Sequence, residues 1–352
     1  MDLINKVKKL GKSVLDKASY LGLIDWIVDS KSIAIVGHDK IDWDSLGSVL
    51  AMQQWIKNKF PNKKIKAYTN RKYPAVFEFL QPEINYWENL KLEEDTDLII
   101  VLDAANLERL GDFYKNNEDK FKNTTLVNID HHISNTQFWN LNIVDWQSPA
   151  TAQLLFEILK ILDLHPMAQM NTLKKWIDGK VATYLLMWIL TDTQSFMIPL
   201  ANAKTLWIAK ELIELGADKQ YLIDNIFLSK DVGELKLQWL VFNRIKKLEK
   251  DGKKIYWSYL TNEDIESVGL NPEDSGVGRN LSSLLNQIKD ADFVCLWKIK
   301  DEETSVSFRS KEYDVNEVAK KLWWGGHKNA AGAIIKEKLS VEDIERKLKE
   351  IV

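Results

Sequence analysis

Histidine and aspartate are the side chains of this sequence whose types and spacing suit chemistry. The chain has five histidines, and four of them lie in polar segments: His38, the adjacent pair His131 and His132, and His327. Aspartates accompany the first three, in the segments HDKIDWDS and DHH. Imidazole and carboxylate ligands without thiolates suit Mn²⁺, Mg²⁺ or Fe²⁺ better than a structural zinc ion. The pattern therefore predicts a metal centre.

Four short apolar runs are expected to form the strands that carry these residues. They are rich in β-branched side chains and bounded by polar turns, as is typical of buried parallel strands, and they cover residues 32–36, 64–68, 97–102 and 125–129. Helical periodicity follows at residues 45–59, 107–120, 150–162 and 171–189. This alternation predicts an α/β fold with a doubly wound parallel sheet.

Candidate metal ligands follow three of the four predicted strands and the last of these helices. In order along the chain, the candidate residues are His38, Asp42, Asp44, Asp103, Asp130, His131, His132 and Asp192. Ligands of open parallel sheets bind outside the carboxyl ends of the strands, so these side chains are expected to converge. Converging carboxylates repel each other unless cations neutralise them. Together the residues predict a dinuclear site.

Each residue taken alone also has an ordinary structural explanation. Asp44 or Ser45 could cap the helix that follows the first strand, because aspartate and serine are preferred helix caps. A lone histidine more often has a structural role, and His165 is an example. The ordered combination, rather than any single residue, favours the metal centre.

A second, smaller α/β domain is expected after two connecting helices, at residues 203–215 and 232–248, with no strand between them. Its predicted elements are a strand at 254–260, a hairpin at 293–309 that turns at 300–304, and helices at 315–322 and 341–351. The first thirty residues are expected to form a helical extension that packs on the first domain.

Composition excludes several classes of protein. The single cysteine, Cys295, cannot form an internal disulfide or a cysteine-rich zinc site. A net charge of −3 provides no global basic field for long nucleic acids. No apolar run approaches the ~18 residues of a membrane span, and the N-terminus lacks a signal-peptide core. A cytoplasmic location without membrane association is therefore expected.

The ordered set of candidate ligands resembles the motifs of the DHH phosphoesterases, and the segment GGHKNAAG at residues 325–332 resembles the glycine-rich signature of their DHH-associated domain. The resemblance implies a catalytic domain at 31–205, connecting helices at 206–250 and a substrate-binding domain at 251–352. The helical extension expected at 1–30 falls outside it. The resemblance also implies one metal on His38, Asp42 and Asp103, and a second on Asp44, Asp103, His131 and Asp192, with Asp103 bridging. His132 would face the substrate phosphate, and Asp130 would orient the histidines.

The family resemblance further implies two divalent ions, with Mn²⁺ favoured over Mg²⁺ or Co²⁺. Two such ions can activate a water for in-line attack on phosphorus. Arg309, Gly325, Gly326 and His327 are expected to bind the substrate. The compact length is similar to that of the family's oligoribonucleases that also act on 3′-phosphoadenosine 5′-phosphate. A RecJ-like single-strand exonuclease and a cyclic or linear dinucleotide phosphodiesterase are alternatives. The expected partners are a short oligonucleotide or nucleotide substrate and a second copy of the chain in a homodimer.

Tryptophan stands at several positions where the family pattern has glycine. The chain has 15 glycines and 14 tryptophans, and the positions concerned are Trp43, Trp139, Trp188, Trp323 and Trp324. One explanation is a catalytically impaired, nucleotide-binding relative, since indoles at 323 and 324 would obstruct a phosphate and the indole at 43 would fill the space between two ligands. Because all the ligands remain, we hypothesise instead that the source organism reads UGA as glycine. UGG codons at these positions would refute that hypothesis.

Overall fold

The computed structural model of the chain forms two compact units. It describes residues 17–39, 41–86, 90–137, 140–163, 176–198, 200–273, 277–278 and 280–352. The first unit comprises Met1–Tyr73 and Phe77–Leu228, and the second Pro74–Val76 and Ser229–Val352. His165, Trp139, residues 1–16 of the predicted extension and residues 171–175 of a predicted helix lie outside the described residues.

A six-stranded, wholly parallel sheet forms the centre of the first unit, with the strand order β3-β2-β1-β4-β5-β6. Its strands are β1 (Ser32–Val36), β2 (Lys64–Tyr68), β3 (Ile84–Asn85), β4 (Leu98–Leu102), β5 (Thr125–Asp130) and β6 (Leu141–Val144). The change of direction in the strand order lies between β1 and β4, where such sheets bind ligands. The predicted doubly wound parallel sheet is confirmed.

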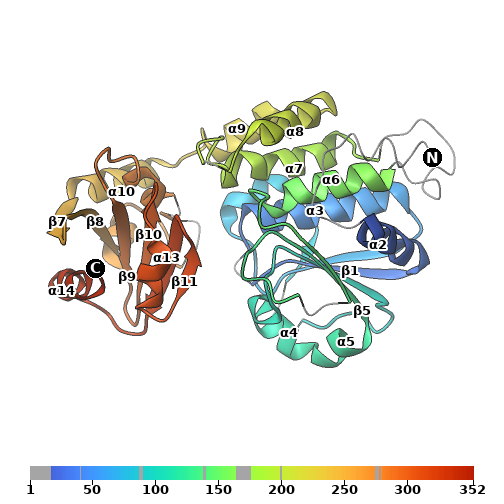
Figure 1. The fold of residues 1–352 in the computed structure, drawn as a ribbon, viewed down its shortest axis with the longest axis horizontal. Coiled ribbons are helices and arrows are strands. Elements are labelled where there is room, and N and C mark those ends of the chain that lie inside the picture. The colour runs from blue at the N-terminus through green and yellow to red at the C-terminus, as the bar shows by residue number, and fades with distance from the viewer. Residues whose placement is uncertain are drawn as a thin grey trace. The chain divides into compact units, whose positions relative to one another are not determined.

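Helices cover both faces of this sheet (Figure 1). On one face Ile33 and Ile35 share a core with α3 (Trp43–Lys59), α6 (Thr151–Asp163) and α7 (Gly179–Asp192). On the other face Ala34 and Val36 share a core with α4 (Asp112–Asn116) and α5 (Glu118–Asn123). The alternation of side chains along a strand explains why neighbouring residues of β1 serve different cores. The remaining elements of the unit are α2 (Lys17–Asp29), the 3₁₀ helices η1 (Ala75–Leu80), of which only Phe77–Leu80 belongs to this unit, and η2 (Leu107–Leu110), α8 (Ala203–Glu214) and α9 (Lys219–Ile226).

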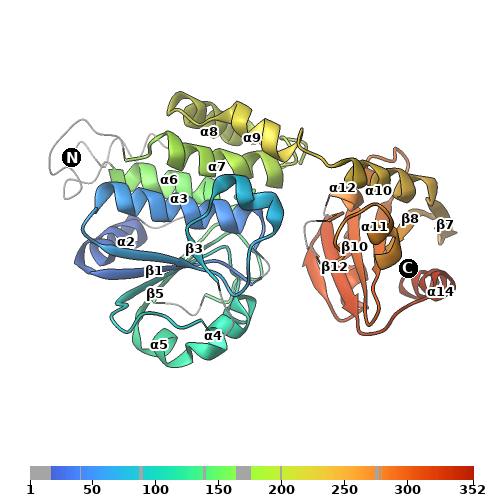
Figure 2. The ribbon, with the colours of Figure 1, turned by 180° about the vertical axis from the view of Figure 1, so that it is seen from behind.

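The second unit has a mixed sheet with the order β11-β12-β10-β9-β8-β7, which Figure 2 shows from behind. Only β8 and β9 pair in parallel, and the other neighbours are antiparallel. The strands are β7 (Lys246–Lys250), β8 (Lys253–Thr261), β9 (Phe293–Ile299), β10 (Thr304–Ser310), β11 (Gly325–His327) and β12 (Ala330–Ile335). The helices are α10 (Val232–Asn243), α11 (Asn262–Ser267), α12 (Leu281–Leu285), α13 (Val315–Lys320) and α14 (Val341–Ile351). A smaller α/β domain, as predicted, therefore ends the chain.

Some predicted elements are wrong in detail. The helix expected at 107–120 is divided into η2, α4 and α5, and the helix expected at 232–248 ends at Asn243 and is followed by strand β7. Strands β3, β6, β11 and β12 were not anticipated. Among the described residues, no helix combines the length and the apolar character that crossing a membrane requires.

Candidate metal centre

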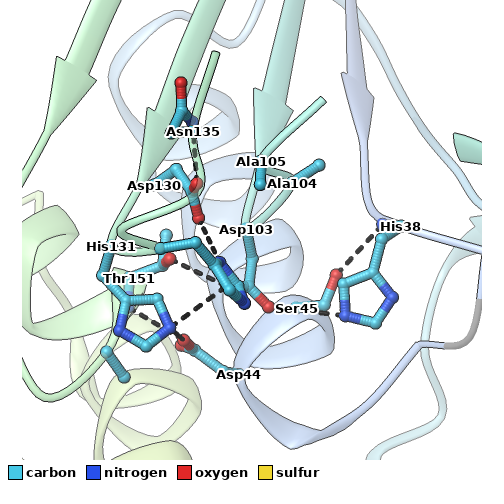
Figure 3. Close-up of polar contacts among 12 residues, drawn as sticks. His38, Asp44, Ser45, Asp103, Ala104, Ala105, Asp130, His131, Asn135 and Thr151 are labelled. Atoms are coloured by element: carbon cyan, nitrogen blue, oxygen red, sulfur yellow. Dashed lines mark hydrogen bonds and ion pairs between the residues drawn. The ribbon is translucent and has the colours of Figure 1, made fainter. Parts of the chain in front are cut away.

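Asp103 lies at the centre of the candidate site, at the carboxyl end of β4 (Figure 3). Its Oδ2 atom is 3.5 Å from Nε2 of His38, and its Oδ1 atom is 3.6 Å from Nε2 of His131. Asp103 is buried and has a φ of 61°, a left-handed conformation that aspartate tolerates better than most residues. One carboxylate thus faces a different histidine with each oxygen.

His38 follows β1 in the chain and lies on one side of Asp103. Its Nε2 atom is 3.5 Å from carboxylate oxygens of both Asp42 and Asp103, which is too long for a well-formed hydrogen bond. This nitrogen is buried and has no hydrogen-bond partner in the described part of the chain. Although burial disfavours the imidazolium, the two carboxylates outweigh it and raise the pKa of His38 to about 9. A buried nitrogen between two carboxylates is the arrangement that a shared cation would satisfy.

His131 and His132 follow β5 on the other side of Asp103. Nδ1 of His131 donates to the carbonyl oxygen of Ser148 at 3.3 Å, so its Nε2 carries the lone pair that a metal would need. Nδ1 of His132 is 2.7 Å from Asp130. Burial lowers the pKa of His131, whereas Asp130 overcomes the effect of burial and raises the pKa of His132. The two adjacent imidazoles therefore differ in protonation tendency.

Asp44 joins this centre to α6. Its carboxylate accepts hydrogen bonds from the backbone N–H groups of Thr151 at 2.8 Å and Ala152 at 3.1 Å. The hydroxyl of Thr151 donates to Asp103 at 3.0 Å. Nε2 of His131 lies 3.7 Å from Asp44. The first turn of α6 thereby fixes both carboxylates.

The electrostatics of the centre favour cations. Burial, followed by repulsion from Asp103, Asp192 and Asp42, raises the pKa of Asp44 well above its usual value. This repulsion also places Asp192, at the end of α7, within electrostatic reach of Asp44. Converging buried carboxylates with imidazole nitrogens directed among them fit divalent metal ions.

Two triads of described residues have ligand atoms within 4.8 Å of one another, and both include Asp103: His38 with Asp42, and His131 with His132. The structure thus groups His38, Asp42, His131 and His132 around Asp103, and Asp44 lies 3.7 Å from His131. Asp192 is linked to the centre by its electrostatic effect on Asp44. The structure also places His132, expected to face substrate, as a neighbour of Asp103 at 3.7 Å.

Sequence reasoning missed the residues that hold these side chains. They are Thr151, which binds Asp44 and Asp103, Ser148, which binds His131, and Asn135, whose Nδ2 donates to Asp130 at 2.7 Å. The position of Thr151 at the start of a predicted helix was the available signal. The helix cap predicted at Asp44 or Ser45 is instead Asp42, whose side chain accepts from the N–H of Ser45.

The predicted substrate-binding residues share one sheet of the second unit. In register, Arg309 on β10 and His327 on β11 both pair with Ala330 of the intervening strand β12. Burial lowers the pKa of Arg309, whose Nη1 donates to the carbonyl oxygen of Phe308 at 2.8 Å. The backbone therefore places these two residues in register on either side of Ala330.

Gly325 and Gly326 lie in strand β11 rather than in an open loop. The N–H of Gly326 donates to Oδ1 of Asn316 at 2.9 Å, so it is already engaged. A Cβ atom at Gly326 would lie 2.6 Å from the carbonyl oxygen of Ala330, closer than real Cβ contacts. Close strand packing, in addition to any phosphate contact, thus explains the glycine at this position.

Trp323 occupies a position that glycine normally takes. Its N–H donates to the carbonyl of Lys320, and the N–H of Trp324 donates to that of Ala319, which is the Schellman pattern at the end of α13. Trp323 has a φ of 65° in this pattern, and its side chain is 95% exposed. The left-handed backbone supports the hypothesis that glycine is native at 323.

Replacing Trp323 with glycine is expected to stabilise the protein by about 1 kcal/mol, because glycine avoids the cost of the left-handed conformation and little buried surface is lost. Trp323→Ala is the matched control, since alanine keeps that cost and should bring no such gain. Calorimetric unfolding of the two variants distinguishes them. Equal stability of the glycine and alanine variants would contradict the argument.

Trp43 and Trp188, unlike the exposed Trp323, are buried. The ring of Trp43 packs edge-on against Phe77 at 4.4 Å between centroids, so the expectation that it fills the space between metal ligands is wrong. Trp188 is fully buried on α7, and its indole N–H has no partner in the described part of the chain. An unsatisfied buried donor is unfavourable, which is consistent with a foreign indole at 188.

Comparison with known proteins agrees with these features. The model of the DHH family N-terminal domain matches residues 32–189, and the DHHA1 domain model matches residues 267–352. The chain is 27% identical to a probable bifunctional oligoribonuclease and PAP phosphatase NrnA of Streptococcus mutans, covering 91% of this chain and 95% of the relative. It is 28% identical to the bifunctional oligoribonuclease and PAP phosphatase NrnA of Mycoplasma genitalium, covering 94% and 96% of the two chains. An exopolyphosphatase-related protein from Bacteroides fragilis shares the fold, with a TM-score of 0.83 at 21% identity over 97% of this chain and 98% of the other.

Proposed function

Because this chain carries a DHH family N-terminal domain at residues 32–189 and a DHHA1 domain at residues 267–352, we propose that it is a two-metal phosphoesterase of short oligonucleotides and nucleotide phosphates such as 3′-phosphoadenosine 5′-phosphate. The observation that carries the proposal is the shared position of Asp103 between His38 and the pair His131 and His132. A pair of divalent ions can stabilise both the attacking and the leaving oxygen of a phosphoester, and a carboxylate shared by two groups of candidate ligands suits such a pair.

The proposed roles follow the contacts within the first unit. His38, Asp42 and Asp103 would hold one ion, and Asp44, Asp103, His131 and Asp192 the other. When bound, the ions, with Mn²⁺ favoured, would supply an activated water and neutralise charge at phosphorus.

His132 is the proposed proton-bearing group beside the substrate phosphate. Its Nδ1 lies 2.7 Å from the buried Asp130, which holds the ring and favours the imidazolium. A cationic imidazole can donate a charge-assisted hydrogen bond to a phosphate oxygen. In the second unit, Arg309, Gly325, Gly326 and His327 are the proposed contacts to the rest of the nucleotide.

Metal removal provides the test. Chelated protein is expected to be inactive, and Mn²⁺ should restore release of product from 5′-labelled di- to pentanucleotides and of phosphate from 3′-phosphoadenosine 5′-phosphate. Mn²⁺ should also stabilise the fold, by about 2.7 kcal/mol per site at a free concentration of 100 Kd. Both activity and thermal unfolding are measured on the same samples.

The outcomes separate the alternatives. Absence of turnover with metal bound would reject the proposal and favour the catalytically impaired, nucleotide-binding relative. Activity that rises with strand length would favour a RecJ-like exonuclease, and activity confined to dinucleotides a dinucleotide phosphodiesterase.

A further inference from the structure

Arg109 stands out among the few arginines of this chain. The sequence has 42 lysines but only 6 arginines, so lysine supplies most of its surface charge. Arg244 pairs with Asp264, and Arg346 with Asp343. The guanidinium of Arg109, by contrast, has no hydrogen-bond or ion-pair partner among the residues that the structure describes. An arginine suits such a position when a planar, bidentate contact to an anion is needed.

The backbone holds Arg109 against the loop of the metal centre. Arg109 lies in η2, six positions after Asp103, and its carbonyl oxygen accepts the N–H of Asp39 at 2.7 Å. Asp39 directly follows His38 in the chain. Arg109 is thus tied at its own peptide to the segment that carries one candidate ligand, and it is connected by six residues to the bridging carboxylate.

Further contacts make this arrangement rigid. The carboxylate of Asp39 binds Nδ2 of Asn70, and it accepts from Nε of Arg71 at 3.0 Å. Gly111 has a φ of 63°, and a Cβ atom there would lie 2.8 Å from Asn70 and 3.0 Å from Asp39. The backbone at Gly111, two residues after Arg109, therefore packs closely against Asn70 and Asp39. The loops that follow β1, β2 and β4 contact one another around Asp39, and these contacts hold the backbone of Arg109 in place.

The positive charge of Arg109 reaches the candidate site. Arg109 interacts electrostatically with His132, the imidazole proposed to lie beside the substrate phosphate. The proposed ligands include four carboxylates. Two divalent ions would neutralise their negative charge but would leave no excess positive charge for the substrate. A nucleotide with two phosphates brings additional negative charge, and a cation in the first unit would stabilise the phosphate that is not attacked.

We propose that Arg109 binds the second, non-reacting phosphate of a nucleotide at this centre, held in place by Asp39, Asn70 and Arg71. The inference rests on the proposed function, because it assigns a subsite of the same centre. It predicts that the protein binds nucleotides with two phosphate groups more tightly than those with one. The difference in affinity would come from Arg109, a residue of the first unit.

The test compares adenosine 3′,5′-bisphosphate with adenosine 3′-phosphate and adenosine 5′-phosphate. Binding is measured by calorimetry with Ca²⁺ in the full-length protein, and turnover with Mn²⁺. Arg109→Ala should weaken binding of the bisphosphate, and raise its KM, by about 10- to 100-fold, as expected for a lost charge-assisted contact. Affinity for the monophosphates should change by less than about twofold, within the range of surface substitutions. Arg109→Lys should retain part of the bisphosphate affinity.

Arg346→Ala, which removes another exposed arginine in α14, is the matched control and should leave all three affinities unchanged. Equal weakening of mono- and bisphosphates by Arg109→Ala, or no weakening, would overturn the subsite, as would absence of bisphosphate binding to the unmodified protein. If the unmodified protein binds the bisphosphate through Arg109 but turns over no substrate, the phosphoesterase proposal fails while the subsite stands.

Discussion

Replacing Asp103 with asparagine is expected to abolish binding of metal and to lower phosphoesterase turnover by at least about 10³-fold. Loss of an outer hydrogen-bond partner of a metal ligand typically costs 10–100-fold, and Asp103 is the only residue shared by both described triads of candidate ligands. Asparagine tolerates the left-handed backbone at this position, so the variant should fold. Metal content by mass spectrometry and turnover of 3′-phosphoadenosine 5′-phosphate give the result.

Asp112→Asn is a matched control, because Asp112 is an exposed carboxylate that pairs with Lys115 on α4. It should keep full metal content and activity. Retention of two ions and of more than a tenth of the activity in Asp103→Asn would show that Asp103 does not bridge the metals.

Replacing Asp130 with asparagine is expected to reduce turnover by about 100-fold while metal content is maintained, at the upper end of the range for residues that act through a neighbouring group. Asp130 is fully buried and contacts His132 at 2.7 Å, whereas neither described triad of candidate ligands includes it. An asparagine could still hold the ring but would no longer favour its charged form. The measurement is kcat against pH, with metal content determined on each sample.

His132→Ala provides the companion variant. If Asp130 acts through His132, the double variant should be scarcely less active than His132→Ala alone, because residues that act as a unit give non-additive effects. Additive losses, or loss of metal from Asp130→Asn, would contradict this role. Asp130 and Asp103 thus differ in a measurable way, although both end neighbouring strands.

The parallel strands of the first unit could be predicted because their β-branched runs are continuous and short. The helix at 107–120 could not be predicted correctly, because two of its residues serve tertiary structure. Gly111 adopts a positive φ beside Asp39, and the side chain of Asn117 binds both the N–H of Leu92 and the carbonyl of Leu90. The periodicity of apolar residues within 107–120 gives no information about the contacts that Gly111 and Asn117 make with distant residues.

Strand β7 was wrongly predicted as part of a helix for a different reason. Its sequence, KKLEK, continues the helical pattern of α10, yet Leu248 pairs with Ile255 across an antiparallel hairpin. The turn at Asp251 and Gly252, both with positive φ, makes that pairing possible. A helical pattern of lysines at an edge strand is ambiguous without knowledge of the partner strand.

The candidate ligands could be predicted because their residue types are rare and ordered, whereas their supports could not. Thr151 is one threonine among many at the start of a helix, and only the fold brings it to Asp44 and Asp103. The tryptophans divide in a similar way. The family pattern marked Trp323, but the left-handed backbone gives the physical reason, and the packing of Trp43 on Phe77 removes the steric objection at that position.

The bond between Asp44 and Thr151 has a consequence for biosynthesis. These residues are 107 positions apart, and ribosomes add about 5–20 residues per second, so about 5–20 s separate their synthesis. During this interval the first ligands emerge without the helix turn that later fixes them. The centre can form only after α6 (Thr151–Asp163) has been synthesised, and a nascent chain that stops before residue 151 should leave its carboxylates in water.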